Sequence, residues 1–319
     1  MKTASAPSQR GPDSVNHASA PALDYGRRRW RLGDAPAAIL LLAPAMVLFA
    51  VATIYPLLET IRISFWDIQG LRKPVFTGFG NYILLFSDAG FRNTLLTTLW
   101  FTAGVTIISV GLGWVLAMLC ALAPRQTLVF RMMFFAAFGI SETVSGYMWT
   151  GIFRADKGGL LNSFIELFGF PDFAFAWLGN ANTALWALII SSAWSAVGLP
   201  LMLIFAAIQS IPKSVLEAAY MDGAKPLSTM RFIMAPLSLP GVRVAVFINL
   251  LTALRAFDII YVLTNGGPAR ATETVGYFIY RESMTQFKLG YGAAATIVLL
   301  VAFLIVSAPA VIQRTAGAK

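Results

Sequence analysis

Six long apolar stretches run through this sequence, and they restrict the folds open to it more than any other feature. The hydrocarbon core of a bilayer is about 30 Å thick, so a helix needs about 20 apolar residues to cross it. The stretches are continuous, which favours helices over the alternating strands of a membrane barrel. We therefore predict an all-α, polytopic membrane protein with six transmembrane helices, at Ala37–Ile61, Leu95–Leu122, Leu128–Phe153, Thr183–Ile208, Leu239–Leu263 and Tyr291–Ile312.

The composition agrees with a membrane protein. Of the 319 residues, 57% are hydrophobic and only 12% are charged, and the mean hydropathy is +0.70. A chain with so few charges cannot cover a soluble core with polar surface. Prolines lie inside the predicted helices, and we expect kinks at Pro44, Pro56 and Pro200.

The basic residues predict how the chain is oriented. The termini and every second loop carry more Lys and Arg than the loops between them, and Arg27–Arg31 holds a basic cluster just before the first apolar stretch. The positive-inside rule therefore places both termini and the loop at 210–237 in the cytoplasm. A cleavable signal is the weaker interpretation of this cluster, because the apolar run of about 25 residues exceeds the 7–15 of a signal.

The first residues differ in composition from the rest. Residues 1–35 are rich in Ala, Ser and Pro and show no apolar periodicity, so we predict a disordered cytoplasmic tail. A six-helix membrane domain follows at 36–315. The net charge of +9 fits the positive-inside bias and attraction to anionic lipid, and no basic stripe with interleaved aromatics indicates nucleic-acid binding.

Several kinds of chemistry are excluded by what the sequence lacks. Cys120 is the single cysteine and His17 the single histidine, so thiolate metal sites and histidine-based triads within the membrane are not available. The sequence contains no G-x-x-x-x-G-K-[ST] phosphate loop. We predict no catalytic residue and no metal site, and energy for transport has to come from another subunit or an ion gradient.

A polar segment between the fourth and fifth apolar stretches carries the most specific motif. Ser214 and Glu217 have the spacing of a capping box, which predicts a helix start. Gly223 suits the left-handed residue that ends a helix, and Pro226 suits the first turn of the next. We expect two short helices joined by a bend, exposed on one membrane face.

This segment resembles the EAA loop of ATP-binding-cassette importer permeases. The motif has Glu-Ala-Ala, three residues, Gly, nine residues, Ile, two residues and Pro, and this spacing matches. Ala235, the residue directly before that Pro, stands where the family usually has leucine. The resemblance implies that the loop contacts an ATPase subunit. The residues implied in this coupling are Glu217, Ala218, Ala219, Asp222, Gly223, Ile233 and Pro236.

The resemblance extends from about Ile39 to Ile312 and is strongest, after the loop, at Arg255–Arg281. Within the importer permeases it is closest to the carbohydrate-uptake group similar to the maltose-system subunit, without that subunit's large outer insertion. It implies the type I importer permease fold in a bacterial inner membrane. It also implies a second homologous permease, two ATP-binding subunits that hold ATP and Mg, an extracytoplasmic solute-binding protein, and a sugar, polyol or glycerol-3-phosphate-like solute.

Polar residues inside the apolar stretches are candidates for the translocation path, because a charge in the hydrocarbon is costly and usually faces a cavity or a partner. Glu142 appears mid-span, where these permeases often have proline; a hydrogen bond to another helix is the alternative to a role in the path. Arg255 and Asp258 have the i, i+3 spacing of an ion pair, which we favour over direct substrate contact. The remaining candidates, for hydrogen bonds to or stacking on a sugar, are Asn249, Thr252 and Tyr147.

Two other classes of function are weaker. A secondary transporter would use Glu142 and Asp258 for ion coupling, but the sequence shows no half-to-half repeat and that class has no use for an EAA-like loop. An intramembrane enzyme would need a nucleophile with a base, or a metal set, and the sequence has neither.

Overall fold

A computed structural model of the chain describes residues 35–123, 125–170 and 173–316. Nearly all of the predicted tail falls on residues 1–34, outside this part. The chain divides into two compact units, Met1–Tyr55 and Pro56–Lys319. In the first unit, α1 (Ala35–Phe49) continues into a π-helical turn, η2 (Ala50–Ile54).

The prolines of the first apolar stretch act differently. Pro44 lies inside α1, which continues past it. Pro56 directly follows a wider turn, in which the backbone N–H of Tyr55 donates to the carbonyl of Ala50, five residues back. A proline has no N–H and its ring clashes with the carbonyl four residues earlier, so a π turn just before it relieves the clash. The same arrangement recurs at Pro236, where the N–H of Ala235 donates to Met230.

The second unit is almost entirely helical, and its two short strands, β1 and β2, form one antiparallel pair. Its elements are α2 (Tyr55–Ser64), β1 (Trp66–Asp67), β2 (Val75–Phe76), α3 (Gly80–Ser87), α4 (Ala89–Leu122), α5 (Leu128–Phe138), α6 (Glu142–Ile152), α7 (Leu160–Glu166), α8 (Ala181–Ala196), α9 (Gly198–Gln209), α10 (Lys213–Met221), α11 (Pro226–Thr229), η3 (Met230–Met234), α12 (Ala235–Leu237), α13 (Leu239–Leu254), α14 (Asp258–Leu263), α15 (Val275–Tyr280), η4 (Arg281–Thr285) and α16 (Leu289–Ala316).

The described residues contain up to six membrane spans, as predicted, but only three are single helices. Ile39–Ser64, Ala89–Leu122 and Leu289–Ala308 are each long and apolar enough to cross a membrane. The other three are pairs of helices with a sharp bend between them. Their angles are 100° between α5 and α6, 45° between α8 and α9, and 61° between Pro226–Leu237 and α13.

The structure corrects three predicted spans. The third and the fourth, each predicted as one helix, are broken after Phe138 and after Ala196. The fifth ends at Leu254 and not at Leu263, because the residues after Leu254 leave the helical conformation and Phe257 has a φ of −135°. Apolar residues lie on both sides of each break, so an average of hydropathy over a window does not reveal it.

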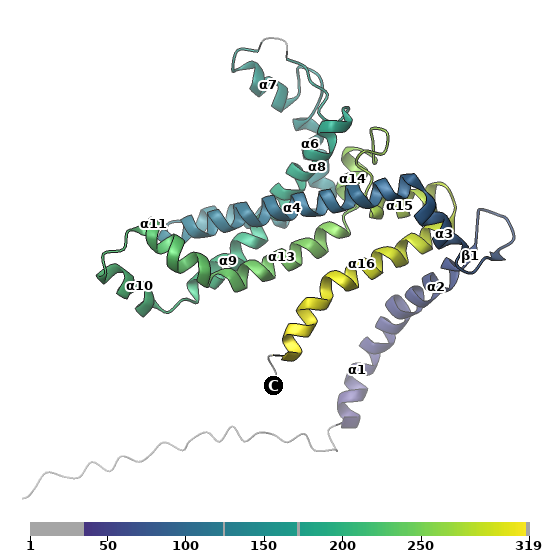
Figure 1. Cartoon of the computed structure of the whole chain (residues 1–319), viewed down its shortest axis with the longest axis horizontal. Coiled ribbons are helices and arrows are strands. Elements are labelled where there is room, and N and C mark those ends of the chain that lie inside the picture. Colours follow the sequence, from purple (N-terminus) through teal and green to yellow (C-terminus); the bar gives the residue numbers. More distant parts are fainter. Residues whose placement is uncertain (1–34, 124, 171–172, 317–319) are drawn as a thin grey trace, which may run out of the picture. The chain divides into compact units, whose positions relative to one another are not determined.

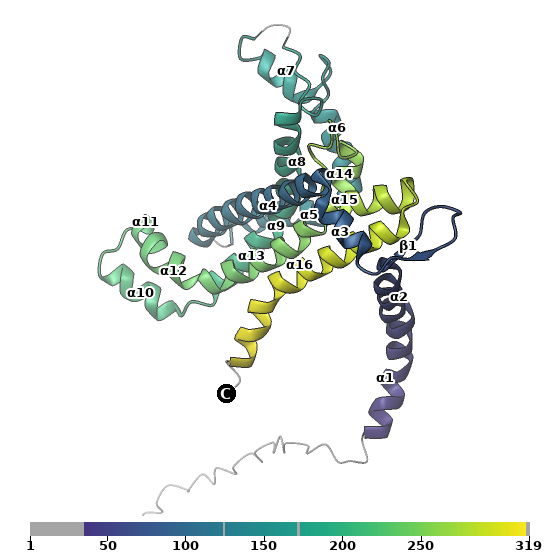
Figure 2. The same cartoon turned by 45° about the vertical axis from the view of Figure 1, so that its right-hand side comes forward.

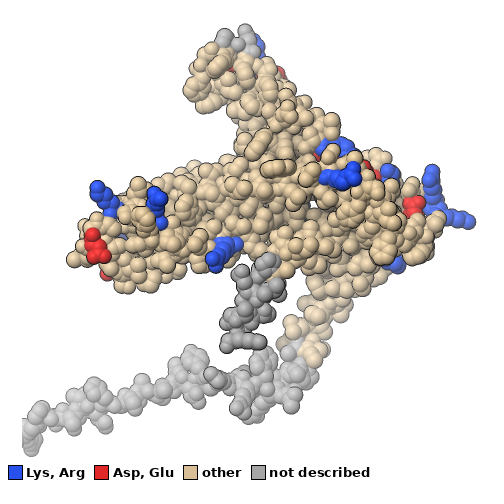
Figure 3. Space-filling model, in the orientation of Figure 1, with Lys and Arg blue, Asp and Glu red and all other residues tan. Residues whose placement is uncertain are grey.

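Helix α4 is the centre of the second unit. It packs against α8, α9 and α13 (Figures 1 and 2). The loop helices α10 and α11 lie at one end of α4, and α3, α14 and α15 lie at the other. Charged side chains gather mainly toward these two ends, and uncharged atoms cover most of the middle (Figure 3). This distribution suits a unit whose middle is in hydrocarbon.

A glycine sets the distance between α4 and α9. A Cβ added to Gly113 would lie 2.7 Å from the Cβ of Pro200 and 2.9 Å from the backbone nitrogen of Leu201. These are backbone and ring atoms that cannot rotate away. Close approach through small residues is the usual way in which membrane helices gain packing energy.

We predict that Gly113→Leu separates α4 from α9 and destabilises the protein by about 1–3 kcal/mol, the usual cost of overpacking. The control is Gly111→Leu, because a Cβ there meets no atom within 4 Å. The measurement is the yield of monodisperse protein on size-exclusion chromatography. Equal yields of the two variants would show that this contact does not limit folding.

Candidate functional site

The predicted coupling loop begins differently from the motif. Helix α10 starts at Lys213, and its N-cap is Pro212, with no side-chain capping bond. Ser214 lies inside the first turn, so the predicted capping box with Glu217 does not form. The extended conformation of Pro212, φ −56° and ψ 131°, sets the start of the helix in its place, and its carbonyl accepts the N–H of Val215.

The predicted bend is present at Gly223, which has a φ of +76°. The N–H of Gly223 donates to Tyr220, and the N–H of Ala224 donates to Ala219, which together form a Schellman motif. Lys225 is extended and Pro226 opens α11 as its first residue, as predicted. A Cβ at position 223 would meet no atom within 4 Å, so only the backbone conformation requires glycine there.

The loop has an inner and an outer face. Ala219 is buried, while Glu217, Ala218 and Asp222 are exposed. Leu216 packs with Met230 and Met234 against the core around α4 and α9. Large apolar side chains are nevertheless exposed on the outer face: Tyr220, Met221 and Leu227, at 79%, 83% and 75%. An exposed apolar group beside charged residues indicates a protein interaction surface.

The other end of the predicted motif lies against the membrane helices. Ile233 is half-buried in η3, and Pro236 lines a groove together with Trp114 of α4. The Trp114 indole N–H donates to the Ser238 hydroxyl at 3.3 Å. These contacts tie the end of the loop to the central helix.

A cavity of about 80 Å³ lies among α4, α5, α6, α8 and α13. It has room for several water molecules. Three of the predicted path residues line it: Glu142, Asn249 and Thr252. The other lining residues are Phe101, Val105, Phe138, Ile140, Ser192, Ser195, Ala196, Ala253, Ala256 and Ile259.

Some polar groups at the cavity already have partners. The Asn249 amide accepts a hydrogen bond from Ser109 at 3.0 Å and donates to the carbonyl of Ala245, which links α13 to α4. The hydroxyls of Ser145 and Ser195 lie 2.8 Å apart and link α6 to α8. Asn249 is therefore also a structural link between helices.

Glu142 lies in the middle of the third span, but at a break and not inside a continuous helix. It is the first residue of α6, directly after the 100° break. Gly139 ends α5, and the carbonyl of Ser141 accepts the first bond of α6, from Ser145. A carboxylate in the first turn interacts favourably with the helix dipole, which explains why an acidic residue suits this position.

The predicted ion pair between Arg255 and Asp258 is wrong. In the part of the chain that the structure describes, the two residues form no ion pair with each other. Arg255 is the C-cap of α13, and Asp258 begins α14 after a break, so the i, i+3 geometry of one helix does not apply. Both are exposed, and the charges of both act on Glu142.

Tyr147 does not reach the cavity. It is 68% exposed on α6, whereas Ser145 and Gly146 form the buried face of this helix. A Cβ on Gly146 would lie 2.9 Å from Val262, so α6 is pressed against α14 at that face. Tyr147 points away from this contact and is not among the residues of the cavity.

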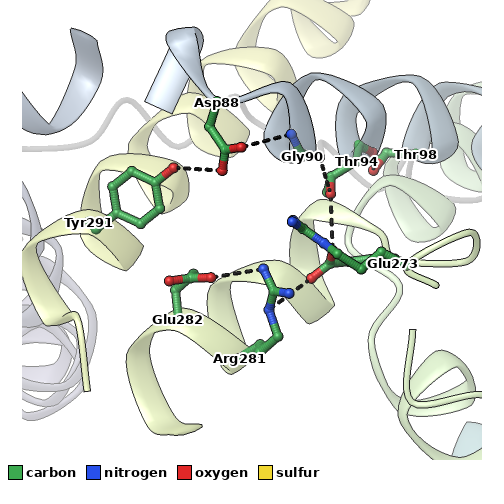
Figure 4. A network of polar contacts seen from close by, with 9 residues as sticks. Asp88, Gly90, Thr94, Thr98, Glu273, Arg281, Glu282 and Tyr291 are labelled. Atoms are coloured by element: carbon green, nitrogen blue, oxygen red, sulfur yellow. Dashed lines mark hydrogen bonds and ion pairs between the residues drawn. The ribbon is translucent and has the colours of Figure 1, made fainter. Parts of the chain in front are cut away.

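Sequence reasoning missed a buried polar network near α15 (Figure 4). The Glu273 side chain is only 1% exposed; it pairs with Arg270 and lies 3.1 Å from Nε of Arg281. Thr94 of α4 also donates to Glu273, at 3.4 Å. The network thereby holds α4 and η4 together. The sequence signal for this network was a single acidic residue, Glu273, with Arg270 before it and Arg281 after it.

The network continues along η4 and α16. Glu282 pairs with Arg281 at 2.8 Å and with Lys288 at 3.3 Å. Tyr291 donates to Asp88 at 3.2 Å, and Asp88 also accepts the N–H of Gly90 as the N-cap of α4. These contacts fix the ends of three helices, so we assign the network to stability.

Comparison with protein families decides the class of the protein. Residues 37–314 match the family described as binding-protein-dependent transport system inner membrane component. The chain belongs to this family. It is a multi-pass permease of a binding-protein-dependent ATP-binding-cassette importer, and the family gives no support to an ion-coupled transporter.

Curated relatives of the permease span most of its length. It is 32% identical over 290 residues to the sulfoquinovosyl glycerol transport system permease protein SmoG of Agrobacterium fabrum, covering 88% of this chain and 91% of that one. It is 29% identical over 263 residues to the sn-glycerol-3-phosphate transport system permease protein UgpA of Escherichia coli, covering 82% and 88%.

Solved structures share the fold of the permease. A chain of a bacterial alginate ABC transporter, in complex with an alginate pentasaccharide-bound periplasmic protein, superposes with a TM-score of 0.73 at 20% identity. It covers 86% of this chain and 92% of that one. The predicted importer permease fold is therefore confirmed.

We predict that Glu273→Ala destabilises the permease by about 3 kcal/mol, because it removes one member of a buried group of charges and leaves two arginines without their carboxylate. The matched control is Glu59→Ala, since Glu59 pairs with Arg62 at 2.5 Å on an exposed surface. That change should have little effect. The measurement is the midpoint of thermal unfolding in detergent, and equal midpoints would contradict a stabilising role for the network.

Proposed function

We propose that this chain forms half of the translocation path for a sugar, polyol or glycerol-3-phosphate-like solute. A second homologous permease forms the other half. Two cytoplasmic ATP-binding subunits bind ATP and Mg and drive the cycle, and an extracytoplasmic binding protein delivers the solute. The names of the relatives support this class of solute, and the family supports a binding-protein-dependent system.

The observation that carries the proposal is the shape of the loop at 210–237. A short helix, a left-handed glycine and a second helix present charged and apolar side chains outward. An amphipathic helix of this kind suits a groove on a partner protein. The partner is an ATPase subunit, so the loop and both termini are cytoplasmic, as the excess of basic residues also favours.

The cavity is the part of the path that this chain supplies. Its polar lining includes Glu142, Ser192, Asn249 and Thr252, which can exchange hydrogen bonds with the hydroxyl groups of a solute. Apolar residues form the rest of the wall, as in most small-molecule sites. Solute passes when ATP-driven movement of the loop separates the helices.

The proposal predicts which subunits purify with a tagged chain. The wild-type protein should bring down an ATPase and a second permease from membranes. Glu217→Lys reverses a charge on the outer face of the loop and should lose the ATPase while it keeps the second permease. The control is Glu166→Lys on α7, which should keep both; retention of the ATPase by Glu217→Lys would overturn the docking site.

A second prediction concerns the bend. Gly223→Val places a β-branched residue at a φ of +76° and should cost about 1–2 kcal/mol, whereas Gly223→Asn should cost less, because asparagine tolerates this conformation. We expect Gly223→Val to insert and assemble but to hydrolyse ATP without uptake of solute. Gly223→Asn should transport at close to the wild-type rate. Normal uptake by a well-expressed Gly223→Val protein would contradict the role of the bend in coupling ATP hydrolysis to uptake.

A further inference from the structure

The cavity contains two polar groups that have no hydrogen-bond partner in the part of the chain that the structure describes. The Glu142 carboxylate lines the cavity and makes no hydrogen bond or ion pair among the described residues. The Ser192 hydroxyl, on the facing helix α8, is buried and has no hydrogen-bond partner. A buried hydroxyl is nearly always hydrogen-bonded, so Ser192 needs a partner that enters the cavity. The half-buried Glu142 carboxylate lines the same cavity and is available to the same molecule.

The two groups differ in what they can bind. A serine hydroxyl both donates and accepts, but an ionised carboxylate only accepts. Hydroxyl and ammonium groups of a solute can donate to Glu142. A phosphate or carboxylate group of a solute has no proton to donate at neutral pH and would place a second negative charge beside the first.

Glu142 sets the charge of the cavity. It is the only charged residue among those that line it in the described part of the chain. Two further charges of opposite sign, Asp258 and Arg255, act on it from the break between α13 and α14, and neither lines the cavity. Glu142 is the first residue of α6, and the N-terminal end of a helix favours an ionised carboxylate.

We propose that Glu142 is a specificity-determining residue that makes the path selective for neutral or cationic polyhydroxy solutes over anionic ones. The inference rests on the proposed function and narrows it, since it removes glycerol-3-phosphate-like solutes from the class. A solute hydroxyl or ammonium group donates to Glu142, and the Ser192 hydroxyl binds a second polar group of the same molecule. An anionic solute is repelled at the narrow part of the path.

The charge of the cavity can be measured without knowledge of the solute. A reporter thiol is introduced by Thr252→Cys, because Thr252 lines the same cavity, in a Cys120→Ala background. The protein, assembled with its companion subunits in membrane vesicles, is treated during ATP turnover with a cationic or an anionic methanethiosulfonate reagent. The measured quantity is the ratio of the two reaction rates, relative to the same ratio for a small thiol in water.

We expect the cationic reagent to react preferentially, and we expect Glu142→Gln to lower the rate ratio about tenfold or more, since one charge acts with opposite sign on the two reagents. Glu142→Asp keeps the charge and should keep the ratio. The matched control is Glu166→Gln, which removes a negative charge from α7 outside the cavity and should leave the ratio unchanged. If Glu142→Gln does not assemble, Asp258→Asn should still lower the ratio.

The outcomes distinguish a failure of the proposed translocation path from a failure of charge selection by Glu142. If neither charged reagent nor a small neutral one modifies the thiol, the cavity is not on a water-filled path, and the proposed function fails at this site. If all reagents react but Glu142→Gln leaves the rate ratio unchanged, the path stands and charge selection is wrong. A preference for the anionic reagent would instead assign the dominant field to Arg255 and would also overturn the inference.

Discussion

Backbone hydrogen bonding in hydrocarbon is the constraint on which this structure depends. Lipid offers no partner to a free N–H or carbonyl, so the chain crosses as helices and can leave the helical conformation only where protein surrounds the break. Three of the candidate spans contain such a break. The break between α5 and α6 lies at the cavity, with Ile140 and Glu142 in its wall. Irregular backbone and polar side chains thus occur together, because both need the same shelter from lipid.

A second consequence is the use of small residues where helices meet. Hydrophobic burial gives little advantage between helices that are already in lipid, so close contact has to supply the attraction. Gly113 allows α4 to approach α9, and Gly146 allows α6 to approach α14. At the far end of α4 the contacts are polar instead. There Asp88 caps the start of α4. Glu273 pairs with Arg270 and Arg281, which offset the cost of burying its charge.

The sequence predicts some of these features and not others, for physical reasons. Apolar length identifies the spans, and the φ requirement at Gly223 identifies the bend, because each depends on residues adjacent in the chain. The breaks after Phe138 and Leu254 were missed, since hydropathy averages over a window and does not register a change of dihedral angles at two or three residues. The Arg255–Asp258 pair was wrong for the same reason.

Contacts between distant segments could not be predicted either. The approach of Ser109 to Asn249, or of Thr94 to Glu273, depends on how helices pack, and no local pattern encodes it. Tyr147 illustrates the limit within one helix: which face of α6 is buried depends on the position of α14. For function, the resemblance at the loop therefore carried more information than any single polar residue in the apolar stretches.

The packing also provides a route between the loop and the cavity. Leu216 and Met234 of the loop belong to one core cluster with Leu201 and Ile204 of α9. Helix α9 joins α8 at the 45° bend, and α8 contributes Ser192, Ser195 and Ala196 to the cavity wall.

At this bend a Cβ on Gly198 would lie 2.3 Å from the carbonyl oxygen of Phe134, so α9 is held directly against α5. Cores as dense as this transmit displacement instead of absorbing it. If the loop is pushed, as the proposed function requires, α9 offers a packed route to the cavity. The bends on either side, at α8 and after α5, are then the places where the helices would change direction.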